Sequence, residues 1–134
     1  MKRSIYIIIY LLLTIAIGAI GDGMAIDHAT KLTHLFKAFE ILLLISCGFV
    51  FKLTIRNLIA LLVVYISLRI ACFDPIHNIV AGLDILYVGT TSLWDKLISN
   101  WVPTGIVFAR VIFLLLGIGV AFKELNNEHK FKTD

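Results

Sequence analysis

Four long apolar runs fill most of the chain, and nearly every charged residue lies near one end of a run. Each run is 17 to 19 residues long, close to the roughly 20 residues that an α-helix needs to cross the hydrocarbon core of a bilayer. The runs cover residues 5–21, 35–51, 57–73 and 104–122. We therefore predict an all-α, polytopic integral membrane protein in which residues 1–134 form one four-helix transmembrane domain.

The composition supports the same class. Hydrophobic residues make up 60% of the chain and charged residues only 16%, so much of the apolar surface needs lipid as its solvent. The net charge of +3 is not accompanied by a basic stripe with interleaved aromatic residues, which argues against a nucleic-acid partner. We interpret the first apolar run as an uncleaved helix, because it is long and Gly18–Gly21 is a poor cleavage site.

The positions of the basic residues predict the orientation. Seven cations flank the runs on one side of the predicted membrane: Lys2, Arg3, Lys52, Arg56, Lys123, Lys130 and Lys132. The loops on the other side hold only Lys31 and Lys96 among several acids. By the positive-inside rule, we expect a multi-pass protein of the cell membrane with both termini, including the tail 123–134, in the cytoplasm.

The predicted outer loop, residues 74–103, carries helix signals. Asp74-Pro75 is typical of an N-cap followed by a first helical residue, and Gly82 suits the end of a short helix.

A second short helix is predicted at 92–101, where apolar residues recur at helical spacing (Trp94, Leu97, Ile98 and Trp101). Such an amphipathic helix belongs in the lipid headgroup layer, with Trp94, Trp101 and Tyr87 as interfacial anchors. The structured extracytoplasmic loop is thus expected to contain one or two short interfacial helices.

The ionisable residues of the helices gather toward the predicted outer side. Arg69 is about one turn from the outer end of its run, and Glu40 falls in the first two turns of the second run. Charges in hydrocarbon are costly, so such residues usually face the bundle interior and pair. We predict a polar, ion-paired pocket below the outer loop. Its candidate residues are Asp22, Asp27, His28, His34, Lys37, Glu40, Arg69, Asp74, His77, Asn78 and Arg110.

Pairings within this layer follow from spacing and charge. Lys37 and Glu40 are three residues apart and can meet on one helix face. Arg69 needs a carboxylate, for which Glu40 and Asp74 are the candidates. The alternative for Arg69 and Arg110 is snorkelling toward the headgroups. For Glu40, a structural salt bridge and a proton-carrying role remain open.

The first apolar run also carries a pattern that bears on helix packing. Tyr6, Tyr10, Thr14 and Gly18 recur every four residues along the first run, which predicts a face that packs within the bundle.

No motif in the chain names a reaction. His28, His34 and His77 are candidate metal ligands with nearby acids, but they lack the paired spacing of established metal motifs, and we expect no cofactor. We predict a non-enzymatic subunit or scaffold that binds membrane lipids, another membrane protein or a second copy of itself. Two alternatives stay open: an outer-leaflet enzyme acting on a lipid or lipid-linked substrate, and a channel or transporter subunit.

Overall fold

The computed structural model describes residues 2–24, 30–88 and 103–126, and within these ranges the chain is helical with short turns. Four long helices are present: α1 (Lys2–Met24), α2 (Thr30–Val50), α3 (Ile55–Val80) and α5 (Pro103–Glu124). Each is long and apolar enough to cross a membrane by length and composition. The all-α, four-helix part of the prediction is therefore confirmed for the described residues, and all four helices are compatible with membrane spans.

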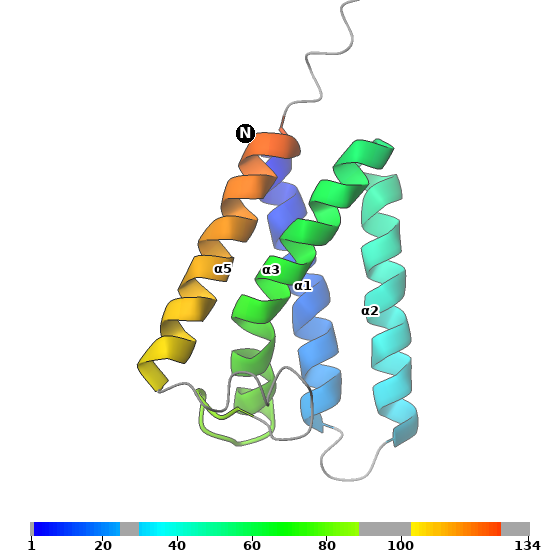
Figure 1. Ribbon diagram of the computed structural model, residues 1–134. Helices are drawn as coiled ribbons and strands as arrows, with labels where there is room; N and C mark the ends of the chain where they lie inside the picture. The colour runs from blue at the N-terminus through cyan, green and yellow to red at the C-terminus, as the bar shows by residue number, and fades with distance from the viewer. Residues whose placement is uncertain (1, 25–29, 89–102, 127–134) are drawn as a thin grey trace, which may run out of the picture.

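The helices form an up-and-down bundle with two ends (Figure 1). At the loop end, α1 and α3 finish and α2 and α5 begin. At the terminal end, α1 and α3 begin and α2 and α5 finish. α1 packs against both α2 and α3, and α5 packs against α3. α2 and α3 converge at the terminal end and diverge toward the loop end, with α1 between them (Figure 1).

The boundaries of α3 correct the prediction for residues 57–73 and for a separate short helix at Asp74. α3 runs unbroken to Val80 with Pro75 inside it, so Asp74 is not an N-cap. A proline inside a helix removes one backbone hydrogen bond, a loss that membrane helices tolerate when their neighbours support them. The end signal is confirmed, since Gly82 has a φ of +68° just after the helix.

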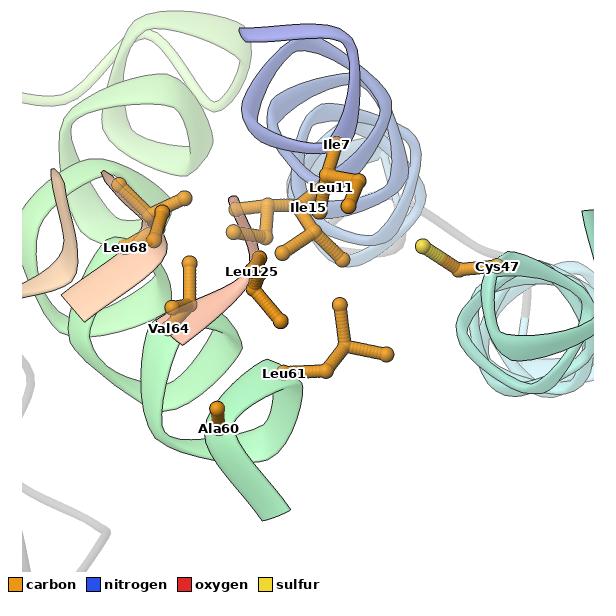
Figure 2. Packing of buried hydrophobic residues seen from close by; sticks show 10 residues of the cluster. Ile7, Leu11, Ile15, Cys47, Ala60, Leu61, Val64, Leu68 and Leu125 are labelled. Atoms are coloured by element: carbon orange, nitrogen blue, oxygen red, sulfur yellow. The ribbon is translucent and has the colours of Figure 1, made fainter. Parts of the chain in front are cut away.

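The apolar core lies where α1, α3 and α5 meet. Figure 2 shows Ile7, Leu11 and Ile15 of α1, spaced four residues apart, facing residues of α3. The buried cluster contains Ile7, Leu11, Ile15, Cys47, Ala60, Leu61, Val64, Leu68, Ala121 and Leu125.

α2 is much less enclosed than α1. Only one side of α2 faces α1, and there Phe36 lies against Gly21 of α1. Gly48 of α2 instead lies against Leu58 of α3. The other side of α2 carries large apolar residues that are more than half exposed: Leu35, Phe39, Ile41, Leu42, Ile45, Phe49 and Val50.

The predicted interfacial helix at 92–101, with Trp94 and Trp101, lies outside the described residues, as do Asp27, His28 and residues 127–134.

Candidate functional site

A buried carboxylate joins α2 to α3. The side chain of Glu40 is only 7% exposed, and its Oε1 accepts a hydrogen bond from the Tyr65 hydroxyl at 2.6 Å. The same oxygen accepts from Nη1 of Arg69, which also donates to the Tyr65 hydroxyl oxygen at 3.0 Å. Of the two candidate partners of Arg69, the structure thus brings Glu40 to it.

A glycine on α1 makes room for this carboxylate. A Cβ atom placed on Gly18 would collide with the carboxyl group of Glu40. Gly18 follows Tyr10 and Thr14 at intervals of four, so the three residues lie on one face of α1. The predicted packing face therefore includes the position where the Glu40 carboxylate rests.

The guanidinium group of Arg69 is also held by aromatic rings. Its central carbon lies 4.1 Å from the ring centre of Phe73 and 5.9 Å from that of Tyr65. The Phe73 ring in turn stacks on His77, with ring centres 6.2 Å apart and planes at 12°. Tyr65, Arg69, Phe73 and His77 recur every four residues, which places them on one stripe of α3.

Sequence reasoning missed Tyr65 and Phe73 as members of this site. Their four-residue spacing around Arg69 and before His77 was the available signal, because residues at this interval stack along one helix face.

The Glu40–Arg69 pair lies deeper than the sequence suggested. α3 continues past residue 73 to Val80, so Arg69 is about three turns from the helix end rather than one. α2 likewise begins at Thr30 instead of residue 35, which puts Glu40 about three turns inside. Because both helices are longer than predicted, the Glu40–Arg69 pair lies near the middle of each helix.

Two further ion pairs lie closer to the loop end. Nζ of Lys37 on α2 is 3.3 Å from Oδ1 of Asp22 on α1, within ion-pair distance but without hydrogen-bond geometry. Nη2 of Arg110 on α5 is 3.4 Å from Oδ2 of Asp74 on α3. Lys37 and Glu40 thus pair with different helices rather than with each other. The side chain of Arg110 is only 12% exposed, which does not fit snorkelling.

Side-chain hydrogen bonds from Asn78 and Arg110 hold the segment after α3, residues 81–88, against the bundle. Asn78 is 2% exposed, and its Nδ2 donates to the carbonyl oxygens of Tyr87 at 2.8 Å and Ile85 at 3.3 Å. Nη1 of Arg110 donates to the same Ile85 oxygen at 3.3 Å. The side chain of Tyr87 remains 46% exposed at the loop end.

In the half of the bundle nearer the terminal end, the polar contacts are hydrogen bonds between uncharged groups and, near the helix ends, contacts of two arginines. The hydroxyl of Tyr10 lies 2.6 Å from Oγ of Ser46 and donates to the Leu43 oxygen at 3.2 Å, which ties α1 to α2. Near the ends of the helices, Arg3 donates to the Phe51 oxygen. Arg56 pairs with Glu124 at 3.5 Å.

The histidines do not assemble with acids in the described part of the chain. His34 is exposed on α2, whereas Nδ1 of His77 on α3 lies 3.2 Å from Oδ1 of Asn78. No group of three or more metal-ligating side chains forms among the described residues, and His28 lies outside them.

Comparison of this chain with protein-family models, with curated proteins and with solved structures finds no match.

Proposed function

We propose that this protein is a non-enzymatic component of the cell membrane, a subunit or scaffold that associates with another membrane protein or with a second copy of itself. One observation carries the proposal: in the half of the bundle nearer the loop end, each of the carboxylates Asp22, Glu40 and Asp74 forms an ion pair with a cation of a neighbouring helix. Asp22 faces Lys37, Glu40 faces Arg69, and Asp74 faces Arg110. Groups committed to such pairs hold helices together and are poorly placed to exchange protons with a substrate.

The exposed apolar surface supports association within a bilayer. α2 presents large residues such as Phe49, which is 79% exposed, and α5 presents Phe108, which is 67% exposed. Surfaces of this kind contact either acyl chains or the helices of a partner.

For the orientation, we propose that the terminal end faces the cytoplasm. Its described cations (Lys2, Arg3, Lys52, Arg56 and Lys123) support this, by the positive-inside rule. Cysteine labelling tests it in a Cys47→Ala/Cys72→Ala background. Lys52→Cys is expected to react with an impermeant maleimide only after the membrane is opened, and Leu83→Cys is expected to react in intact cells.

The central experiment is the mass of the protein extracted in a mild detergent, by light scattering and native mass spectrometry. We expect complexes heavier than the 15.0 kDa chain and chemical cross-links between membrane-embedded subunits. A monomer without a bound protein would contradict the proposal. Turnover of a membrane lipid that Glu40→Gln abolishes, at unchanged folding, would instead favour the enzyme alternative.

A further inference from the structure

One edge of the Arg69 guanidinium has no acceptor within the described part of the chain. Both hydrogen bonds of this group start from Nη1 and go to Glu40 and Tyr65. Nε and Nη2 have no partner among the described residues, and the side chain is 33% exposed. Arginine keeps its charge at any physiological pH, so these N–H groups stay donors in every state of the protein.

Exposed apolar residues lie near Arg69 on α3. Ile66 and Leu62 precede Arg69 on the same side of α3 and are 54% and 49% exposed. In the hydrocarbon core of a bilayer, leaving one N–H group without an acceptor costs several kcal/mol of free energy, because no water is present to accept its hydrogen bond. The unsatisfied edge is therefore open to an oxygen ligand that the described residues do not supply.

The geometry of the edge selects the ligand. Nε and Nη2 present parallel N–H groups, which match two oxygens of one phosphate. The plane of the guanidinium is fixed beforehand, because Glu40 holds Nη1 and the Phe73 ring lies 4.1 Å from the central carbon. Such preorganisation lowers the ordering cost of binding.

We propose that the Nε–Nη2 edge of Arg69 binds the phosphate of a phospholipid whose acyl chains lie along the exposed apolar sides of α2 and α3. Because Arg69 lies about three turns from the end of α3, the lipid enters from the loop end, where α2 and α3 diverge, and its phosphate is drawn below the headgroup layer (Figure 1). Glu40 already balances the charge of Arg69, so binding depends on the phosphate and its two-point hydrogen bonding more than on net headgroup charge. This inference rests on the proposed membrane location.

The test counts phospholipids retained by the full-length protein after detergent exchange, by quantitative lipid analysis and native mass spectrometry. Wild type is expected to keep about one phospholipid per chain. Arg69→Lys keeps a cation for Glu40 but loses the parallel edge, and retention is expected to fall about tenfold. Arg56→Lys is the matched control: Arg56 is exposed at the terminal end, and retention is expected to be unchanged.

Other results would overturn the inference. Equal retention in wild type and Arg69→Lys, with thermal unfolding unchanged, removes the site. Binding of inorganic phosphate by delipidated wild type, with no phospholipid retained, identifies a free-anion site instead. A co-purifying protein lost from Arg69→Lys, with lipid unchanged, assigns the edge to a partner's carboxylate. A chain that is membrane-inserted and oligomeric but lipid-free refutes this inference alone, whereas a chain absent from the membrane refutes the proposed function.

Discussion

The carboxyl group of Glu40 occupies the space that a side chain on Gly18 would fill. Two residues from different helices thus depend on each other: the glycine admits the carboxylate, and the carboxylate ties α2 to α3 across α1. A small residue at a helix crossing is a common route to close approach in membranes. Here the room is taken up by a charged group rather than by a neighbouring backbone.

Gly18→Ala is expected to destabilise the bundle because its methyl group displaces Glu40 from Arg69 and Tyr65. Overpacking of this kind costs about 1–3 kcal/mol. Thermal unfolding in detergent, followed by circular dichroism, measures the loss. Gly119→Ala on α5 is the control, since nothing lies within 4 Å of a Cβ added there. Equal midpoints for the two variants would show that the Gly18 contact is unimportant.

The Glu40–Arg69 pair should behave as a coupled unit. Glu40→Gln leaves the cation of Arg69 unpaired, and Arg69→Gln leaves a carboxylate that is 7% exposed without its cation. Each single change is expected to lower the free energy of unfolding by more than half of the loss in the double variant. The expected coupling energy is about 0.5–3 kcal/mol. A double-mutant cycle in urea or by thermal unfolding gives this number. Strict additivity would mean that the two side chains do not interact.

Much of the fold could be predicted, because the hydropathy and length of an apolar run are enough to identify a helix that can span a bilayer. The partners within the bundle could not, because sequence gives the residues on each helix but not the rotation of one helix against another. Lys37 and Glu40 are suitably spaced for a pair on α2, yet each faces a different helix in the structure. Asp74-Pro75 resembles a helix start, but Asp74 instead supplies the anion for Arg110 within a continuous α3.

Tyr10 offers a test of neutral polar contacts between α1 and α2. Tyr10→Phe removes the hydroxyl that contacts Ser46 at 2.6 Å and donates to the Leu43 oxygen. Hydrogen bonds between membrane helices average about 0.6 kcal/mol, so a small loss of stability is expected, well below that of Glu40→Gln. Tyr6→Phe is the matched control, since Tyr6 is 60% exposed. A Tyr10→Phe loss as large as that of Glu40→Gln would show that charge pairing has no special weight in this bundle.

Asn78 should control the order of the segment that follows α3. Asn78→Leu keeps a side chain of similar length but removes the donors to the Ile85 and Tyr87 oxygens, and the 2% exposure of Asn78 leaves no water to replace them. Hydrogen exchange is expected to speed up by about tenfold at the amides of Leu83 and Tyr87, which donate to the backbone oxygens of Asn78 and Asp84, respectively. This corresponds to about 1.4 kcal/mol of lost protection.

Arg110→Gln, which loses the bond to Ile85 and the pair with Asp74, should produce a similar change. His34→Gln on exposed α2 serves as the control. If exchange of these amides stays at the wild-type rate in both variants while the helices remain folded, then the turn after α3 is stabilised by its own backbone hydrogen bonds and not by α3 and α5.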